Sequence, residues 1–227
     1  MVRNARQVRQ HQLAFRNWGG ARRGAGRKPS GDRPRVSHSA RPALAARHPV
    51  HVTVRAKAGL PSLRRDASRR ALERVIACAS DRLGARVVHY SIQSNHVHFV
   101  IEAASRVALS RAMLGLQVRL ARALNELWRR AGAVLADRYH ARILSTPREV
   151  RNALVYVLHN ARHHGLRVVG VDPFSSGAWF DGWRELAARA TRASPCATAA
   201  TWLLSVGWCR AGYIGVAESP VIVARRV

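Results

Sequence analysis

From residue 48 onward, the order of apolar and polar side chains becomes periodic. Residues 48–56 alternate in the way that a strand with one buried face does. Residues 66–83 instead repeat at helical spacing, and Gly84 is suited to end that helix. The apolar face of this helix consists of Leu72, Val75, Ile76 and Ala79. The pattern therefore predicts a strand followed by an amphipathic helix.

The next apolar stretches are strand-like and close together. Residues 85–93 form one of them and residues 96–103 the other, with only Ser94 and Asn95 between them. Because so short a connection joins antiparallel neighbours, we expect a β-hairpin.

A long helix with two stripes is predicted over residues 105–130. The stripe expected to face the core contains Leu109, Met113, Leu116, Leu120, Leu124 and Leu127. The opposite stripe contains Arg111, Arg119, Arg122 and Arg129. Such an arginine stripe is either a solvated face or a row of phosphate contacts, and the sequence leaves both readings open.

The last two predicted elements are a strand at residues 138–145 and a second capped helix. Thr146 and Glu149 have the spacing of a capping box, with Pro147 at the first helical position. We expect this helix to continue to about His163 and to end at Gly165.

The order β-α-β-β-α-β-α predicts an α+β fold with a ferredoxin-like antiparallel sheet and helices on one face. We assign this domain to residues 48–170. Residues 1–47 precede it as a basic arm, and residues 171–227 follow as a tryptophan-rich C-terminal extension. We expect the aromatic side chains of the extension to pack against the main domain.

The charge balance points to a polyanionic partner. The chain has 227 residues, with 39 Lys and Arg against 12 Asp and Glu, and a formal net charge of +27. A folded chain this basic is typical of nucleic-acid binding. In the arm, the candidate phosphate contacts are Arg22, Arg23, Arg27 and Lys28; in the long helix they are Arg111, Arg119 and Arg122.

Three widely spaced cysteines fit neither a disulfide framework nor a zinc knuckle, which favours a reducing compartment. The sequence also has no apolar stretch of membrane-spanning length and no apolar secretory leader. We therefore expect a cytoplasmic, nucleoid-associated protein without membrane contact.

Candidate chemistry begins with His96 and His98. Alternate residues on a strand share one face, so both imidazoles are expected to point the same way and to be able to hold one divalent metal, Mg²⁺ or Mn²⁺. The capped helix adds Tyr156, Asn160 and His163 on one exposed face, with His159 close by. A tyrosine hydroxyl beside such a metal is able to attack a phosphodiester.

Two segments carry a resemblance to a known family. The run Asn95-His96-Val97-His98 resembles the HUH motif (His, bulky apolar residue, His) of the IS200/IS605-type single-tyrosine transposases, in particular the REP-associated branch. The helix from Tyr156 to Gly165 is similar to the tyrosine-bearing helix of that branch, and the resemblance covers about residues 48–166. Ser94 and Ala161 depart from it, because proline is usual at both positions.

The resemblance implies a function and a set of roles. His96 and His98 would be metal ligands, Asn160 a third ligand through its amide, and Tyr156 the nucleophile. The family cuts single-stranded DNA at hairpin-flanked sites and leaves a 5′-phosphotyrosine and a free 3′-OH, so rejoining is also expected to be possible. Such a protein would act as a monomer or a homodimer.

Three alternatives stay open. The chain would be a domesticated, non-catalytic binder of structured DNA if it no longer cuts. An RNA-binding protein on the same scaffold is a further possibility, although its strands offer only Tyr90 and Phe99 as stacking platforms. Finally, Tyr139 is a rival nucleophile, but no amide lies one helical turn away from it.

Overall fold

The fold is built around one antiparallel sheet. The computed structural model describes residues 42–185 and 190–219. The strands are β1 (Val50–Arg55), β2 (Asp81–Arg82), β3 (Ala85–Ile92), β4 (His96–Ala103) and β5 (His140–Ile143), in the spatial order β2-β3-β4-β1-β5. Every pair of neighbouring strands is antiparallel. The predicted order of elements and the ferredoxin-like sheet are confirmed, with the short β2 as an added edge.

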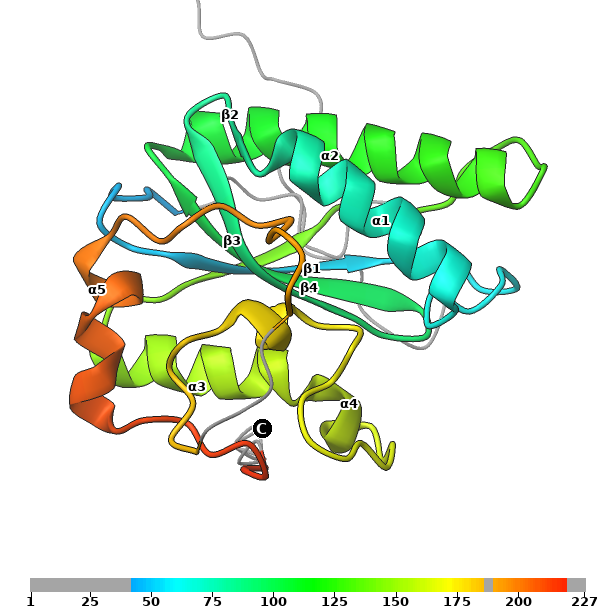
Figure 1. Cartoon of the computed structure of the whole chain (residues 1–227). Coiled ribbons are helices and arrows are strands. Elements are labelled where there is room, and N and C mark those ends of the chain that lie inside the picture. The colour runs from blue at the N-terminus through cyan, green and yellow to red at the C-terminus, as the bar shows by residue number, and fades with distance from the viewer. Residues whose placement is uncertain (1–41, 186–189, 220–227) are drawn as a thin grey trace, which may run out of the picture. The chain divides into compact units, whose positions relative to one another are not determined.

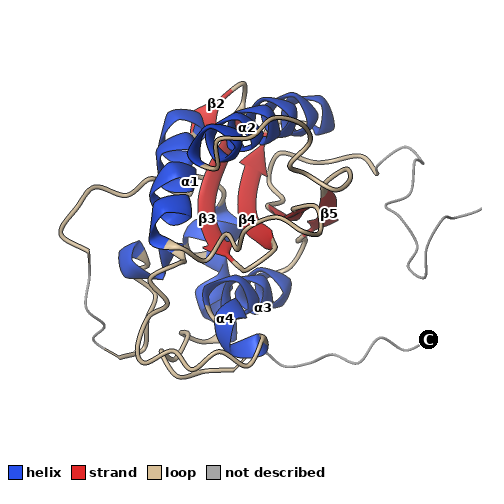
Figure 2. Cartoon of the chain, turned by 90° about the vertical axis from the view of Figure 1, so that its right-hand side faces the viewer, coloured by secondary structure: helices blue, strands red, loops and turns tan. Residues whose placement is uncertain are grey.

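The helices lie on both faces of this sheet. The main ones are α1 (Asp66–Ala79), α2 (Arg106–Leu127) and α3 (Pro147–Leu158). Shorter helices are α4 (Asn160–His163), η1 (Ser176–Trp179), α5 (Trp202–Ser205) and η2 (Gly207–Ala211). Figure 1 shows α1 and α2 on one side of the sheet and α3 on the other, and Figure 2 shows the same layers from the side. The prediction that the helices share one face is therefore wrong.

Strand alternation explains why both faces are covered. Along β1 and β4, every second side chain belongs to a core beneath α1 and α2, which includes Val52, Phe99 and Leu120. The intervening positions of β4 face α3, where Val100 packs with Leu154 in a second core. β4 is buried along its whole length, as expected for a central strand that is covered on both sides.

The predicted apolar stripe of α2 is buried over most of its length. Leu109, Met113, Leu116, Leu120 and Leu124 are buried as predicted. Leu127 is 38% exposed, which corrects its placement in the core. It is the last residue of α2, and the chain turns just after it, at Arg129, which has a positive φ.

The C-terminal extension packs against α3, as predicted for its aromatic side chains. Phe180, Leu203, Trp208 and Ile214 join the second core together with Leu154 of α3. Trp202 and Tyr213 are exceptions, with 49% and 54% of their surfaces exposed. Within the described residues, no helix has the length and apolar character needed to cross a membrane.

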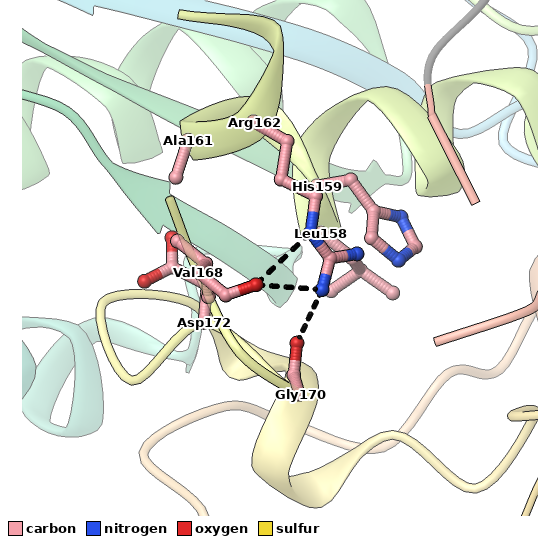
Figure 3. A pocket seen from close by; sticks show the side chains of 7 residues that line it. All are labelled: Leu158, His159, Ala161, Arg162, Val168, Gly170 and Asp172. Atoms are coloured by element: carbon pink, nitrogen blue, oxygen red, sulfur yellow. Dashed lines mark hydrogen bonds between the residues drawn. The ribbon is translucent and has the colours of Figure 1, made fainter. Parts of the chain in front are cut away.

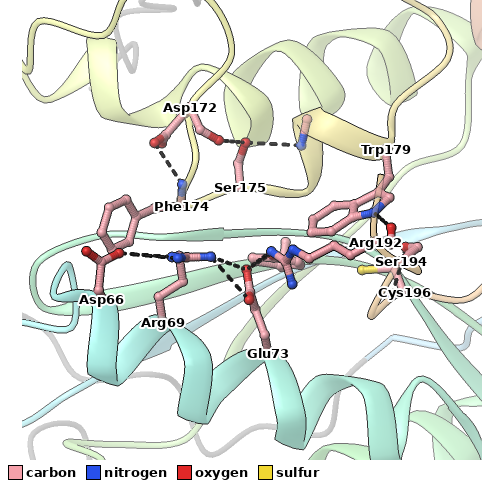
Figure 4. Close-up of polar contacts among 12 residues, drawn as sticks. Asp66, Arg69, Glu73, Asp172, Phe174, Ser175, Trp179, Arg192, Ser194 and Cys196 are labelled. Carbon is pink, nitrogen blue, oxygen red and sulfur yellow. Dashed lines mark hydrogen bonds and ion pairs between the residues drawn. The ribbon is translucent and has the colours of Figure 1, made fainter. Parts of the chain in front are cut away.

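Buried carboxylates connect the extension to the sheet and to α1. Glu102, near the end of β4, accepts hydrogen bonds from the backbone N–H groups of Ala200 and Thr201 and from the Thr201 hydroxyl, at 2.7–3.1 Å. On α1, Glu73 accepts from Arg192 at 3.0 Å (Figure 4). It also accepts from the Tyr90 hydroxyl at 2.7 Å. Removing either carboxylate would leave buried donors unpaired, so these contacts stabilise the position of the extension.

Candidate functional site

The imidazoles of His96 and His98 lie on one face of β4, as predicted. Val97 between them points into the core under α1 and α2. The two rings have their centroids 4.6 Å apart and are nearly perpendicular. Both residues are buried, with 8% and 3% of their surfaces exposed. β4 thus carries two neighbouring imidazoles into the layer between the sheet and α3.

Hydrogen bonds hold one nitrogen of each ring. His96 Nδ1 lies 2.7 Å from Asn95 Oδ1. Because an amide oxygen only accepts, this contact places the proton on Nδ1 and leaves the lone pair on Nε2. His98 Nδ1 lies 3.0 Å from Thr53 Oγ1 and 3.1 Å from His51 Nε2, whereas His98 Nε2 is buried without a hydrogen-bond partner.

Tyr156 reaches the histidine cluster, which consists of His51, His96 and His98, from α3. Thr146 caps the helix by accepting from the Glu149 N–H, and Pro147 occupies the first turn, as the sequence predicts. The Tyr156 ring packs edge-on against His98, with centroids 5.2 Å apart, and it also lies 5.3 Å from the ring of His163. The predicted meeting of the histidine strand and the tyrosine helix therefore occurs within one chain.

The helix that carries Tyr156 is shorter than predicted. α3 ends at Leu158, His159 leaves helical geometry with φ −108° and ψ 17°, and α4 begins at Asn160. Asn160 is completely buried, and neither polar atom of its amide has a hydrogen-bond partner. Its amide nevertheless lies near enough to His96 to favour the charged form of that ring. A buried, unpartnered amide is costly unless it meets a ligand.

His159 does not join the cluster, which corrects its expected position. The break in the helix turns its ring toward the extension, where Nε2 lies 3.0 Å from the Val216 carbonyl oxygen and the ring packs against Trp183. His164 takes part instead, with its ring centroid 5.2 Å from that of His96.

Arg162 fixes the chain just beyond Asn160. Its guanidinium donates to the carbonyl oxygens of Val168 and Gly170, at 2.7–3.3 Å (Figure 3), and to that of Val216. These bonds draw the loop after α4 and the segment of the extension around Val216 together around one side chain. The position of Asn160 is thereby coupled to the C-terminal extension.

Burial favours the neutral form of the His51, His96 and His98 imidazoles. Burial, followed by nearby positive charge from His164 and Arg55, lowers the pKa of His96 to about 4, and the Asn160 amide opposes this shift. Burial also lowers the pKa of His98. His51 has its pKa lowered to about 4 by burial and by the neighbouring His140 and Arg142. Neutral imidazoles are the form that binds metal ions.

The side chains of this site offer imidazole nitrogens and an amide oxygen, which are donor atoms that suit a divalent cation. No group of three or more His, Cys, Asp or Glu side chains in metal-binding arrangement occurs among the described residues. The candidate set is instead His96, His98 and the Asn160 amide. The unpartnered buried atoms His98 Nε2 and Asn160 Oδ1 are what such an ion would satisfy.

The candidate DNA contacts are separated from this cluster. Arg111, Arg119 and Arg122 lie on α2, on the opposite face of the sheet from Tyr156. Arg22, Arg23, Arg27 and Lys28 lie outside the described residues. Tyr139, the rival nucleophile, is 6% exposed in the core under α2, and its hydroxyl lies 3.4 Å from Ser110 Oγ.

Sequence reasoning missed the contribution of β1. In the sheet register, Thr53 is opposite His98 and Arg55 is opposite His96. His51 lies against both His98 and Tyr156. The alternation of polar residues at 51, 53 and 55 was visible, but only the β1–β4 pairing reveals that they join the histidine cluster.

Comparison with known proteins identifies the family and a shared fold. The family model described as "Transposase IS200 like" matches residues 45–159, about half of the chain. Among solved structures, the chain is similar to a REP-associated tyrosine transposase bound to a REP hairpin, with a TM-score of 0.52 and 15% sequence identity. That match covers 62% of this chain and 82% of the other, and it shows a shared fold. No curated protein matches the sequence.

Proposed function

The chain belongs to the family of IS200-like transposases, and from this premise we propose that it cleaves single-stranded DNA through a covalent bond to Tyr156. The substrate would be a single strand next to a hairpin. Cleavage would leave a 5′-phosphotyrosine and a free 3′-OH, and the reverse reaction would rejoin the strand. One observation carries the proposal: the Tyr156 ring packs against the ring of His98, whose Nε2 is buried without a hydrogen-bond partner.

The proposed metal ligands are His96, His98 and Asn160. A bound Mg²⁺ or Mn²⁺ would polarise the scissile phosphate and offset the charge that develops on it. Asn95 supports this role by holding His96 Nδ1, which leaves Nε2 as the free donor. Two nitrogen donors and one amide oxygen form a softer set than Mg²⁺ prefers and also suit Mn²⁺.

Tyr156 would form the new bond. Its hydroxyl oxygen attacks phosphorus and loses its proton, the bond from phosphorus to the 3′ oxygen breaks, and that oxygen takes up a proton to leave as a hydroxyl. The energy of the phosphodiester is kept in the phosphotyrosine bond, which is why rejoining is chemically accessible.

Arg55 is the proposed phosphate contact nearest to the reaction. It is exposed, lies opposite His96 in the sheet register and contributes positive charge to that ring. A guanidinium in this position suits a phosphodiester oxygen. Arg111, Arg119 and Arg122, with the basic arm, would contact the phosphates of the flanking hairpin.

The similar solved transposase was determined with a REP hairpin, which supports a hairpin as the DNA partner here. All residues of the proposed site come from one chain, so a monomer would contain the complete site and a homodimer would carry two. A substrate of this kind places the protein at the nucleoid, in the cytoplasm.

The test is covalent capture. The protein is incubated with 5′- and 3′-labelled single-stranded DNA that contains the hairpins flanking its own gene, in Mn²⁺ or Mg²⁺. We expect a denaturation-resistant adduct that carries only the label 3′ to the cut. Binding of the hairpin without any adduct, in either metal, would favour the non-catalytic DNA-binding alternative.

A further inference from the structure

His51 lies between the proposed metal ligand His98 and the proposed nucleophile Tyr156. Its ring centroid is 5.1 Å from that of His98 and 5.6 Å from that of Tyr156. It comes from β1, whereas His98 is on β4 and Tyr156 is on α3. His51 is therefore the side chain of β1 that contacts both a proposed metal ligand and the proposed nucleophile.

The hydrogen bond from His51 determines how His98 presents its other nitrogen. His51 Nε2 lies 3.1 Å from His98 Nδ1. If His98 Nε2 gives its lone pair to a metal, Nδ1 must carry the proton and donate it. A neutral His51 accepts that proton through Nε2. The same contact fixes the rotation of the His98 ring.

Thr53 offers a second acceptor for the same proton, because its Oγ1 lies 3.0 Å from His98 Nδ1. Thr53 is directly opposite His98 in the sheet, whereas His51 is diagonal to it. The two acceptors differ in their other contacts, because His51 also packs against Tyr156 and Thr53 has no ring with which to do so. The loss of His51 would therefore affect ligand and nucleophile together.

We propose that His51 is a positioning residue, which orients His98 for metal binding and holds the Tyr156 ring against it. This inference rests on the proposed function, since it concerns the same metal and the same tyrosine. Hydrogen-bond partners of metal-ligating histidines typically contribute about 10–100-fold to metal affinity.

The experiment measures Mn²⁺ affinity of the full chain by calorimetry, without DNA. We expect His51→Phe to keep an aromatic ring at this position but weaken Mn²⁺ binding about tenfold, because one acceptor is removed and only Thr53 remains. His51→Gln retains an acceptor and should restore part of the affinity. Combining His51→Phe with Thr53→Val should weaken binding by more than the product of the single effects, since His98 Nδ1–H then has no acceptor.

His89→Phe is the matched control. Like His51, His89 is a half-buried histidine on a strand, but it contacts Ser176 and Phe180 outside the cluster. Its replacement should lower the melting temperature without changing Mn²⁺ affinity. Unchanged Mn²⁺ affinity in folded His51→Phe would overturn the inference while leaving the proposed function intact. Absence of any His98-dependent Mn²⁺ binding in the unaltered chain would overturn both.

A second readout separates positioning of the tyrosine from metal affinity. At saturating Mn²⁺, we expect His51→Phe to form the covalent adduct more slowly, because the Tyr156 ring no longer has its polar neighbour or its fixed orientation. Thr53→Val, which leaves the packing of Tyr156 unchanged, should form it at nearly the original rate. Equal rates in both variants at saturating metal would contradict the contribution to Tyr156.

Discussion

The ring of Tyr156 packs edge-on against the imidazole of His98, at a centroid distance of 5.2 Å. This contact joins α3 to the central strand β4 on the face of the sheet that α1 and α2 do not cover. It exists because β4 alternates, with Phe99 facing one core while His98 and Val100 face the other side of the sheet. Capping at Thr146 fixes where α3 begins and hence where Tyr156 falls along it.

Replacing Tyr156 by Phe should abolish the covalent protein–DNA adduct. The substitution removes one oxygen and keeps the ring that packs on His98, so stability should change by less than about 1 kcal/mol. Hairpin affinity should also be retained. The measurements are adduct formation, thermal unfolding and a hairpin-binding titration on the same preparation.

Tyr139→Phe is the control for that change. Tyr139 is buried in the other core, so its replacement should leave the adduct in place. Loss of the adduct in Tyr139→Phe alone would move the nucleophile to that residue. Persistence of the adduct in the double variant would exclude tyrosine chemistry of this kind.

Removing either proposed imidazole ligand should stop cleavage without preventing DNA binding. His96→Ala and His98→Ala each delete one donor of the proposed set, and we expect adduct formation to fall at least a hundredfold in both. Excess EDTA should have the same effect on the unaltered chain, reversed by added Mn²⁺. Full activity in EDTA, or in the double alanine variant, would refute the proposed metal dependence.

The prediction of side-chain placement from sequence was accurate where one element determined the geometry. His96 and His98 share a face because strand alternation requires it, and the capping box at Thr146 marked the start of α3. The face of the sheet that each helix covers depends on long-range packing, which is why α3 was expected beside α1 and α2.

The errors near the site have a local cause. An uninterrupted helix to His163 would carry His159 along the same exposed side as Tyr156 and Asn160. The break at His159 instead directs its ring to Val216 and Trp183, which lie far along the chain. A helix-period argument contains no information about such partners. The same limit applies to His51, whose contacts with His98 and Tyr156 become apparent only through strand pairing.

Removal of the basic arm should reduce the salt dependence of DNA binding. Deleting residues 1–41 is preferable to deleting 1–47, because Leu44 packs against the first core. Each phosphate on single-stranded DNA that the shortened protein no longer neutralises should lower the slope of log affinity against log salt by roughly 0.7. An unchanged slope would mean that the arm does not touch DNA.

The α2 stripe is tested by a triple variant with Arg111, Arg119 and Arg122 replaced by Gln. If these residues contact the hairpin, the salt slope should fall while cleavage at saturating DNA is preserved, because α2 lies on the opposite face from Tyr156. Arg55→Gln should show the reverse pattern, with slower cleavage and a smaller change in slope. A triple variant with an unaltered slope would identify the stripe as a solvated face.

The stability of the fold should decrease in mild acid, in part through His89. Burial lowers the pKa of His89 to about 4, against an ordinary value of 6.5 for the unfolded chain, and Asp181 opposes the shift. Between these two values the unfolded state binds the proton and the folded state does not, so unfolding becomes easier as pH falls from about 6.5 to about 4. Above pH 6.5 this contribution is fully present.

The measurement is the free energy of unfolding by denaturant, from pH 7.5 to pH 4, for the unaltered chain and for His89→Phe. We expect the slope of stability against pH in this window to be smaller in the variant by up to one proton, and the decrease in stability that His89 causes to be at most about 3 kcal/mol. The variant also lacks the hydrogen bond to Ser176, so its stability at pH 7.5 should already be lower. Parallel curves for the two proteins would show that His89 takes up its proton equally in the folded and unfolded states, contrary to the desolvation of its ring, which packs edge-on against Phe180.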